Sequence, residues 1–443
     1  MSDERPRAAL VVGGGVAGIQ AALDLANRGI HVYLVERSPS IGGHMAQLDK
    51  TFPTMDCSIC ILAPKMVECG RHPGITIITN AEVVGLEGSA GDFKVRVLVR
   101  PRYVDLDKCT GCGICVERCP MRPPLRSIPD EFNMGLGERK AIYIPFPQAV
   151  PRAAIIDPDH CLYFRKKKCM LCEEFCQAEA VDFSQVPREI ELHVGAIVIA
   201  TGFSFLDASI VREYGYGRYR NVLTALELER LVCASGPTSG ELVRPSDGKR
   251  PKRIAFIQCV GSRSLRPGEK PYCSAVCCMY ATKEAILIKE HDPEAEVTIF
   301  YMDLRAFGKG FQGLVSRAKE EYGVRYVRAK PSEVMEDPET GDVIVRYEDT
   351  ETSELHEERF DLVVLCTALV PDQDNAKLAK VLGLKLDEHG FFEVADPLLA
   401  PVDTNVPGIF VCGFCSGPKD ISESVYQASC AAERAMEVVL GEG

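Results

Sequence analysis

Four closely spaced cysteines followed by a proline restrict the fold of this chain more than any other feature of its sequence. They are Cys109, Cys112, Cys115 and Cys119, and Pro120 follows directly. In this spacing a tight loop lets three thiolates hold one [4Fe-4S] cube while the fourth reaches toward another cube. A zinc knuckle uses fewer ligands over so short a stretch, so the spacing predicts iron-sulfur binding rather than zinc.

A modified copy of this pattern follows further along the chain. Residues 156–159 correspond to residues 104–107 ahead of the first run, and the cysteines of the copy are Cys161, Cys169, Cys172 and Cys176. The copy has a seven-residue gap after its first cysteine and no proline after its last. Because the gap is a loop between ligands, its lengthening is compatible with ligation. Residues 100–185 are therefore predicted to form an inserted two-cluster ferredoxin-like α+β domain.

Two-cluster modules cross their ligands, since the fourth cysteine of each run binds the cube of the other run. One cluster is expected to take Cys109, Cys112, Cys115 and Cys176. The other is expected to take Cys161, Cys169, Cys172 and Cys119. The widened gap carries four positive charges, Arg165 to Lys168. They could dock an acidic electron carrier or raise the potential of the neighbouring cluster, and the simpler interpretation is a solvated loop.

A glycine-rich turn opens the first predicted α/β unit. Residues 8–12 are predicted to form a buried strand, 19–27 a helix and 31–35 a second strand that ends at Glu36. In dinucleotide-binding turns the glycines allow the turn, the approach of pyrophosphate and helix packing, and the acidic residue accepts hydrogen bonds from a ribose. This context favours a dinucleotide site over a tight turn alone. The predicted contacts are Gly13, Gly15, Val16, Ala17, Gly18, Glu36, Arg37, Gly42 and Gly43.

A third group of cysteines lies in a second predicted βαβ-like unit, residues 250–360. Residues 254–259, 297–301 and 325–327 are expected to be strands, but the glycine fingerprint is missing after the first of them. In its place stand Cys259 and then Cys273, Cys277 and Cys278, near the start of a helix. A helix N-terminus stabilises thiolates and the charge of a bound cluster, so we expect a third [4Fe-4S] cluster here. A redox dithiol and simple packing are the alternatives.

Length and composition bound the remaining possibilities. The 443 residues suggest about three structural units. A net charge of −12 disfavours nucleic acid or an anionic membrane as a partner, and no apolar stretch is long enough to span a bilayer. The first residues contain no apolar segment with a cleavage site, which predicts a cytoplasmic protein. In a reducing cytoplasm, 20 cysteines indicate metal or redox chemistry rather than a disulfide framework.

Three short segments resemble the two-dinucleotide-binding flavoproteins, to which thioredoxin reductase and glutathione reductase belong. They are Ile41-Gly42-Gly43, the turn Ala200-Thr201-Gly202 after a buried strand, and a closing strand that ends at Gly413. The resemblance implies a Rossmann-like α/β fold and FAD rather than NAD in the first unit.

The closing segment departs from that family in one place. The Asp that usually follows the closing glycine is replaced by Phe414, so the ribityl contact is expected from Asp420, next to Ile421. A long helix is expected over residues 416–436, and in the family its N-terminus points at the flavin. Lys419 at this helix start could place positive charge near the flavin and favour its reduced form.

The chain as a whole resembles the A-subunit family of heterodisulfide reductases, the subunits that carry flavin and iron-sulfur clusters. The resemblance rests on residues 11–20, 44–54, 56–65, 101–104, 257–263, 273–278 and 417–421. It implies an oxidoreductase of anaerobic metabolism in which FAD exchanges a donor's electron pair for single electrons that leave through clusters, with bifurcation in some complexes. The implied partners are other heterodisulfide reductase-like subunits and a ferredoxin, hydrogenase or dehydrogenase-type donor or acceptor, around a homodimerising core. Disulfide reduction is expected on a separate subunit.

Cys57 and Cys60 leave three interpretations open. Disulfide reductases place an active dithiol near this point, directly after the glycine pair and with a wider gap. The pair can therefore be a redox dithiol, extra cluster ligands, or packing against the flavin. Cys412 and Cys415 are expected to be packing residues, as are Cys69, Cys233, Cys366 and Cys430.

The sequence thus predicts five segments: the start of an FAD domain (1–99), the ferredoxin-like insert (100–185), a return to the FAD domain with a linker (186–249), the cysteine-bearing nicotinamide-domain-like unit (250–360) and the close of the FAD domain (361–443). The rival hypothesis is a self-contained NAD(P)H-dependent dithiol reductase, and the missing second glycine fingerprint counts against it. A scaffold that keeps its cofactors only as structure is disfavoured by the complete ferredoxin spacing.

Overall fold

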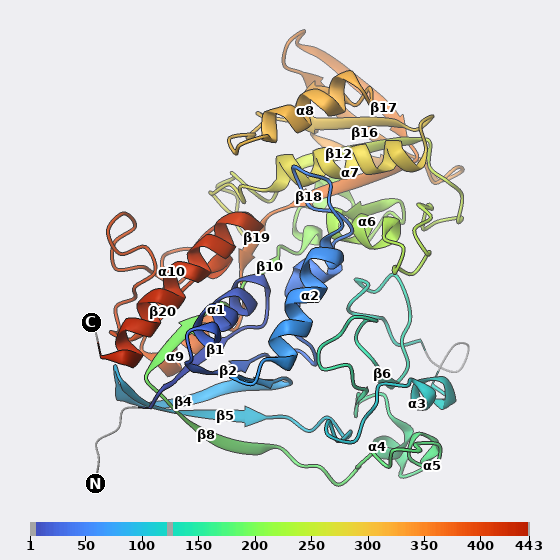
Figure 1. Ribbon diagram of the computed structural model, residues 1–443. Coiled ribbons are helices and arrows are strands. Elements are labelled where there is room, and N and C mark those ends of the chain that lie inside the picture. The colour runs from blue at the N-terminus through green and yellow to red at the C-terminus, as the bar shows by residue number, and fades with distance from the viewer. Residues whose placement is uncertain (1–5, 122–126, 442–443) are drawn as a thin grey trace, which may run out of the picture. The chain divides into compact units, whose positions relative to one another are not determined.

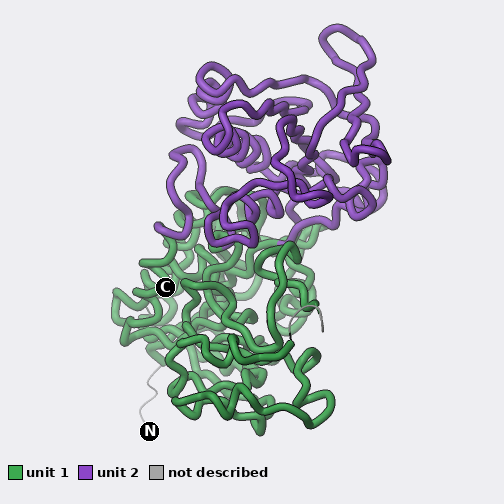
Figure 2. The backbone as a smooth tube through the Cα atoms, turned by 90° about the vertical axis from the view of Figure 1, so that its right-hand side faces the viewer, with its two compact units in different colours: residues 1–46, 61–203, 371–443 green, residues 47–60, 204–370 purple. Residues whose placement is uncertain are grey.

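The computed structural model describes residues 6–121 and 127–441 and divides the chain into two compact units (Figure 2). Unit 1 comprises residues 1–46, 61–203 and 371–443, and unit 2 comprises residues 47–60 and 204–370. The first five residues, which contribute to the expectation of no secretory signal, lie outside the described part. The chain crosses between the units after residues 46 and 60, and again along two short paired strands, β10 (Phe203–Phe205) and β19 (Leu369–Pro371).

A five-stranded parallel sheet forms the centre of unit 1 (Figure 1). Its order is β20 (Ile409–Val411), β9 (Ala196–Ile199), β1 (Ala8–Val12), β2 (His31–Val35) and β3 (Ile75–Ile78). β20, β9 and β1 consist of apolar residues buried along their whole length, as a parallel sheet covered on both faces requires. Helices α1 (Val16–Asn27) and α10 (Ile421–Leu440) pack against each other, and α10 also contacts β9 and β20.

The C-terminal helix does not have the predicted bounds. It was expected over residues 416–436, but residues 413–416 form a 3₁₀ turn, and α10 runs from Ile421 to Leu440. The reason is local: Asp420 and Glu423 form a reciprocal capping box, which fixes the first turn of α10 at this point. Two shorter helices of unit 1 are α2 (Ser58–Arg71), whose first residues belong to unit 2, and α9 (Asn375–Leu382).

A second, antiparallel sheet of unit 1 carries the cysteine-rich insert. It consists of β4 (Ala81–Ser89), β5 (Asp92–Val99) and β8 (Arg188–Val194). Val99 lies opposite Arg188, so the insert leaves and returns at adjacent strand ends. In its described residues, 100–121 and 127–185, the insert holds only short elements: α3 (Ile114–Arg118), β6 (Ile142–Tyr143), β7 (Ile155–Ile156), α4 (Leu162–Lys166) and α5 (Leu171–Glu174).

The insert has a small core to which several of its cysteines belong. Buried Cys119 and Cys172 lie in that core with apolar side chains such as Ile128, Ile142 and Ile156. Four more cysteines pack against it partly buried: Cys109, Cys115, Cys161 and Cys176. Very small cores seldom stabilise a domain without metals or cross-links.

Unit 2 repeats the parallel arrangement. Its main sheet has the order β11 (Val222–Thr224), β18 (Leu362–Thr367), β12 (Arg253–Val260), β13 (Glu296–Tyr301) and β14 (Arg325–Arg328). The connecting helices are α6 (Ala225–Val232), α7 (Cys277–His291) and α8 (Phe311–Glu320). An antiparallel meander, β15 (Glu333–Glu336), β16 (Val343–Asp349) and β17 (Glu354–Phe360), shares an apolar core with the main sheet. The strands expected at 254–259, 297–301 and 325–327 are present as β12, β13 and β14.

Candidate functional site

The glycine turn of unit 1 is shaped as a phosphate cradle. A Cβ on Gly13, which has a φ of +108°, would lie 2.3 Å from the Ala200 carbonyl oxygen, and a Cβ on Gly18 would lie 1.8 Å from that of Gly13. A Cβ on Gly15 would meet nothing within 4 Å. Glycine is thus required for packing at two positions, and the third faces open space at the N-terminus of α1, where backbone amides favour an anion.

Glu36 lies at the end of β2 with its carboxylate held by the backbone. Oε2 accepts a 2.6 Å hydrogen bond from the Gly14 amide, and Oε1 accepts one of 2.7 Å from the Ser38 amide. The Gly42 amide donates to the Gly14 carbonyl at 2.7 Å, so the second glycine pair lies against the first turn. A carboxylate fixed beside the turn fits the adenosine ribose of a dinucleotide.

Arg37, also predicted as a cofactor contact, is engaged in ion pairs. Its guanidinium lies 2.5 Å from Asp372, which is buried, and 3.0 Å from Asp374. Both acids precede α9, so Arg37 ties the end of β2 to the start of this helix.

The closing side of the cradle contains one residue that the sequence did not indicate. The Thr201 hydroxyl donates a 2.9 Å hydrogen bond to Oδ1 of Asn375, whose side chain is almost fully buried and whose Nδ2 has no partner among the described residues. Asn375 is the first residue of α9, far from Thr201 in sequence. Only knowledge of the pairing of β19 with β10, the strand that follows Thr201, could have located it.

The side chains of Lys419 and Asp420 form hydrogen bonds within the closing turn and the first turn of α10. The Lys419 ammonium, whose pKa is lowered by burial, donates to the carbonyls of Gly413 and Gly417 and to the Ser416 hydroxyl at 2.8–3.0 Å. Asp420 caps α10 by accepting from the Glu423 amide, and Ile421 is the first residue of that helix. These contacts shape the closing turn, in which Phe414 is buried against Phe203.

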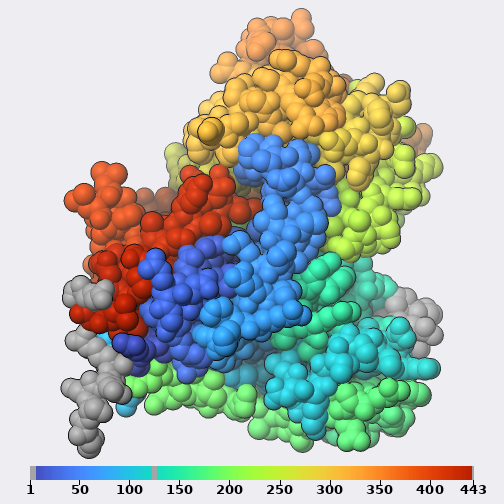
Figure 3. Space-filling model, in the orientation of Figure 1, coloured from blue at the N-terminus to red at the C-terminus, as the bar shows by residue number. Residues whose placement is uncertain are grey.

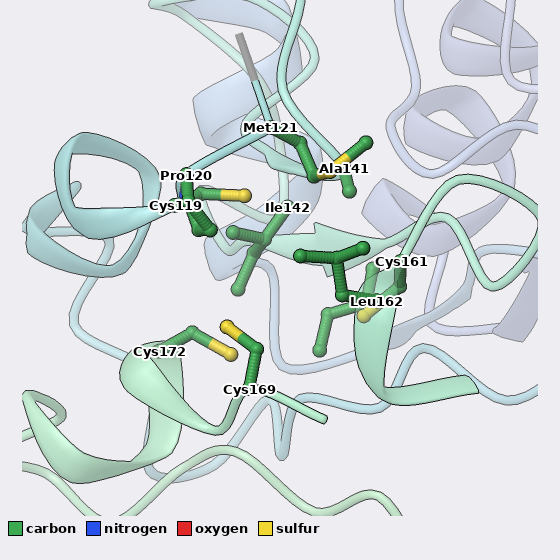
Figure 4. Close-up of a pocket in the computed structure, with 10 residues that line it drawn as sticks. Cys119, Pro120, Met121, Ala141, Ile142, Cys161, Leu162, Cys169 and Cys172 are labelled. Carbon is green, nitrogen blue, oxygen red and sulfur yellow. The ribbon is translucent and has the colours of Figure 1, made fainter. Parts of the chain in front are cut away.

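Four cysteines of the insert line one apolar pocket (Figure 4). They are Cys119, Cys161, Cys169 and Cys172, the set expected for the second cluster. In Figure 4 the sulfurs of Cys169 and Cys172 lie side by side, with Cys119 and Cys161 at other sides of the pocket. Burial raises the pKa of Cys172 to about 12, and Cys161, Cys119 and Cys169, together with Cys115 of the other set, add to the shift. Such thiols stay protonated unless a metal centre takes the thiolates, so the pocket fits a cluster.

The other four cysteines of the insert also lie together. Burial raises the pKa of Cys115 to about 11, and Cys109, Cys112 and Cys176 act on it in the same direction. The Ala180 amide donates to the Cys176 sulfur at 3.3 Å, a bond typical of cluster thiolates. In the described residues no three ligating side chains are placed for a single metal ion. A cube presents four separate irons, which suits more widely spaced thiolates.

The third group surrounds the end of β12. The register of β12 shifts between Ile257 and Val260, and Cys259 within this bulge has a φ of +58°. Burial raises the pKa of Cys278 to about 11, and Cys259 and Cys273 contribute. The amides of Ala275 and Arg305 donate to the sulfurs of Cys273 and Cys278 at 3.4 and 3.5 Å. A bulge with left-handed backbone and amide-bonded sulfurs fits a site that holds a cluster.

The remaining cysteines differ in their surroundings. Cys57 and Cys60 form a disulfide at the start of α2. Cys366, expected as a packing residue, is buried in β18. Burial raises the pKa of its thiol, and the nearby Cys277, Cys278 and Cys259 contribute to this shift. Cys430 is exposed rather than buried, because its side of α10 faces solvent. Cys69, Cys233, Cys412 and Cys415 are buried as expected.

Fold and sites together define a flavoprotein with iron-sulfur modules. A model of the pyridine nucleotide-disulphide oxidoreductases matches residues 165–435, one of FAD dependent oxidoreductases matches 9–55, and one of 4Fe-4S binding domains matches 102–123. The chain belongs to the pyridine nucleotide-disulphide oxidoreductase family. Its fold is similar to thioredoxin reductases of Thermoplasma acidophilum and Lactococcus lactis, with TM-scores of 0.54 and 0.53, sequence identities of 16% and 17%, and coverage of 98% of this chain and 99% of each structure.

Curated relatives confirm the resemblance to the A-subunit family of heterodisulfide reductases. The A-type subunit of the H₂:CoB-CoM heterodisulfide, ferredoxin reductase of Methanothermobacter thermautotrophicus is 53% identical over 98% of this chain. The iron-sulfur subunit of the same type from a CoB-CoM heterodisulfide reductase of Methanopyrus kandleri is 56% identical over 96% of it. The chain spans 64% and 63% of the length of these two relatives. In the described residues, no helix has the length and apolar character needed to cross a membrane.

Proposed function

We propose that this chain is the FAD and iron-sulfur electron-transfer subunit of a heterodisulfide reductase-type complex. The observation that carries the proposal is the gathering of three separate groups of four cysteines in a chain that also has a glycine phosphate cradle. A simple dithiol flavoenzyme has no use for twelve such cysteines. The names of the relatives, which are subunits of heterodisulfide reductases, support this choice.

Each cofactor is assigned to a group of residues. FAD would lie along the contacts predicted from the sequence, between the β1–α1 turn and the closing turn that follows β20. Two [4Fe-4S] clusters would take the crossed cysteine sets of the insert, and a third would take Cys259, Cys273, Cys277 and Cys278. The five-segment domain division is part of this proposal.

When bound, FAD exchanges electron pairs for single electrons, and iron-sulfur clusters carry single electrons. The chain's own residues have simpler tasks. The amides at the start of α1 bind the pyrophosphate, Glu36 orients the ribose, and buried Phe414 and Cys415 exclude water from the closing turn.

The names of the relatives support a proposal about partners. Relatives carry names with hydrogen, formate, ferredoxin or F₄₂₀H₂ as electron donors or acceptors. We expect this chain to exchange electrons with a carrier of that kind in the cytoplasm, as part of a homodimerising core with other heterodisulfide reductase-like subunits. The site of disulfide reduction would lie on one of those subunits.

The test is the content of iron and acid-labile sulfide per FAD in protein purified without oxygen. About twelve irons per flavin, at four per cluster, are expected. About eight would remove the third cluster, and fewer than four would overturn the relay. In addition, NADH should fail to reduce the flavin stoichiometrically, since unit 2 has no second glycine fingerprint after β12. Full reduction by NADH, together with eight irons or fewer, would favour the dithiol reductase.

A further inference from the structure

Arg102 is a buried cation whose side-chain hydrogen bonds end on uncharged oxygens. The residue is 5% exposed. Its Nε donates to the Ala154 carbonyl at 3.0 Å, and its Nη2 donates to the Ala153 carbonyl at 3.1 Å. Its Nη1 donates to the Pro39 carbonyl at 2.9 Å and to the Thr79 hydroxyl at 3.2 Å. These four bonds hold the guanidinium in place and leave its positive charge unbalanced.

Other arginines with little exposed surface have an acidic partner. The side chains of Arg139 and Arg244 are each 9% exposed, and each lies within 2.9 Å of a buried carboxylate. In residues 6–121 and 127–441, no carboxylate forms an ion pair with Arg102. The titratable groups that act on its charge are Cys109 and Tyr143. Arginine is seldom buried without a counter-charge, so one of these two groups should supply it.

The counter-charge has to come from the side of Cys109. Burial raises the pKa of Tyr143, so its phenol is neutral at pH 7. Burial lowers the pKa of Arg102 to about 10, so the guanidinium still carries its charge at that pH. A free thiol is neutral, whereas a metal-bound thiolate is not. We call the cluster that Cys109 would help to bind the first cluster, with the predicted ligands Cys109, Cys112, Cys115 and Cys176.

Arg102 lies where the insert meets the flavin-binding part of unit 1. Two of its acceptors belong to the insert and two to the segment before it. At the same seam the Ile41 amide donates to the Val150 carbonyl at 3.0 Å, directly ahead of Gly42, a predicted flavin contact. Figure 3 shows the cyan surface of the insert against the blue surface of the N-terminal segment, in agreement with these contacts. The cation is therefore fixed between the flavin-binding segment and the first cluster.

We propose that Arg102 is the built-in counter-charge of the first cluster and raises its reduction potential. Reduction adds one electron, and so one negative charge, to the cluster. A cation held in a buried position stabilises the reduced form more than the oxidised form. Arg102 is thus a positioning residue that acts through the cluster, and no bond to it forms or breaks. This inference rests on the proposed function, because it needs a cluster at Cys109.

The experiment is a redox titration of the whole protein without oxygen, followed by electron paramagnetic resonance. Arg102→Gln removes the charge and keeps hydrogen-bond donors. It should raise the ratio of oxidised to reduced first cluster about tenfold at a fixed potential, which lowers one midpoint by ~59 mV. Arg102→Lys keeps the charge and should restore most of the shift. Unmoved midpoints in an Arg102→Gln protein with full iron would overturn the proposal.

The matched control is Arg100→Gln. Arg100 is exposed, two residues away, and donates to the Arg37 carbonyl at 2.9 Å. The change removes the same charge from a position that solvent screens, so every midpoint should stay in place. An equal shift in both variants would mean that net charge, and not the buried cation, sets the potential, and would overturn the proposal.

A second pair of variants keeps Arg102 in place, because Arg102→Gln breaks several bonds at the seam and can lose iron. Thr79→Asp puts a carboxylate beside the guanidinium and balances its charge, whereas Thr79→Asn has the same size and no charge. The Asp variant should lower the midpoint of the first cluster about as much as Arg102→Gln does, and the Asn variant should not. Equal midpoints for the two would overturn the proposal, even where Arg102→Gln has lost its iron.

Iron and acid-labile sulfide per FAD in the unchanged protein are measured first and separate this inference from the proposed function. Full iron with no response of the midpoints to these variants would overturn the role of Arg102 alone. An insert without iron would overturn both.

Discussion

The two parallel sheets of this protein share an arrangement and differ at one turn. In unit 1 the middle strand, β1, is followed by β2 and β3 on one side and by β9 and β20 on the other, and in unit 2 β12 has β13, β14, β18 and β11 in the same places. β1 ends at Val12, and α1 starts at Val16 after three glycines. β12 bulges at Cys259, and α7 begins only at Cys277.

The difference shows how one position in a fold can serve two kinds of ligand. In unit 1 the short turn brings backbone amides close to open space, which suits phosphate. In unit 2 the longer connection puts cysteine sulfurs at the corresponding strand end, which suits iron. A parallel sheet determines where a ligand binds, and the residues of the turn determine which ligand it is.

The largest expected effect is the loss of bound flavin when the glycine turn of unit 1 is changed. Gly18→Ala should abolish FAD binding, because its Cβ would lie 1.8 Å from the Gly13 carbonyl oxygen. Gly313→Ala, where the Cβ would meet nothing within 4 Å, is the control and should bind FAD normally. The measurement is flavin absorbance per chain after desalting. Full flavin in the Gly18 variant would show that the cradle is not the FAD site.

The second prediction concerns iron at the turn of unit 2. Cys273→Ser should lower the iron content from about twelve to about eight per chain while leaving FAD in place. Cys366→Ser, a change of a buried neighbour, should keep all the iron if only the four predicted cysteines are ligands. The measurement for both variants is iron analysis, together with electron paramagnetic resonance of the reduced protein. Should Cys366→Ser lose the cluster instead, the ligand set assigned from the sequence is wrong.

A stability measurement sharpens the comparison between the units. Lys283→Met in unit 2 should lower the free energy of unfolding by ~3 kcal/mol or more, because Glu229 would be left buried without its cation. Lys377→Met in unit 1 breaks an exposed pair with Glu82 and should cost ~1 kcal/mol or less. Urea unfolding of each variant gives both values. Similar losses would mean that burial of the pair in unit 2 has no energetic weight.

The smallest effect, counted per pH unit, is a dependence on pH. Burial raises the pKa of Glu284 well above its usual value, and the neighbouring Glu229 carboxylate adds to this shift against the opposing charge of Lys283. Glu284 stays protonated in the folded chain and ionises in the unfolded chain, so its contribution is complete below the unfolded pKa and is lost as pH rises toward the folded pKa. Glu284→Gln should therefore gain stability relative to the unchanged protein as pH rises, by at most ~1.4 kcal/mol per pH unit.

The check is urea unfolding of both proteins at pH 5, 6, 7 and 8. Asp337→Asn serves as a comparison below this pH range. Arg359 lowers the pKa of the partly exposed Asp337 carboxylate, so the unchanged protein should lose stability relative to this variant as pH falls. A difference between the Glu284 variant and the unchanged protein that does not vary with pH would contradict a protonated Glu284.

Local sequence patterns predicted the parts of the fold that depend on neighbours along the chain. β1 and β2 have the predicted bounds, since short apolar runs between turn residues can form little else. The cysteine sets of the insert follow from ligand spacing, which the loop geometry of a cluster dictates.

Features that depend on contacts between distant segments were not predictable in this way. Asn375 meets Thr201 across more than 170 residues, and Glu229 meets Lys283 from another helix. Cys366 looks isolated in sequence because β18 joins β12 only through the sheet. The start of α10 was a different kind of error, since the capping box of Asp420 and Glu423 is visible in the sequence and marks the helix start.

The pairing of β5 with β8 has a consequence for how this chain could have evolved. Val99 and Arg188 lie opposite each other at the strand ends, so everything between them is topologically the loop of a hairpin. A module of any size can be acquired, lost or exchanged there without a change of register in the host sheet, because loop length costs little entropy. Recombination at these two positions, which are neighbours in the sheet, could thus replace the cluster-binding module of a lineage while the flavin-binding fold stays unchanged.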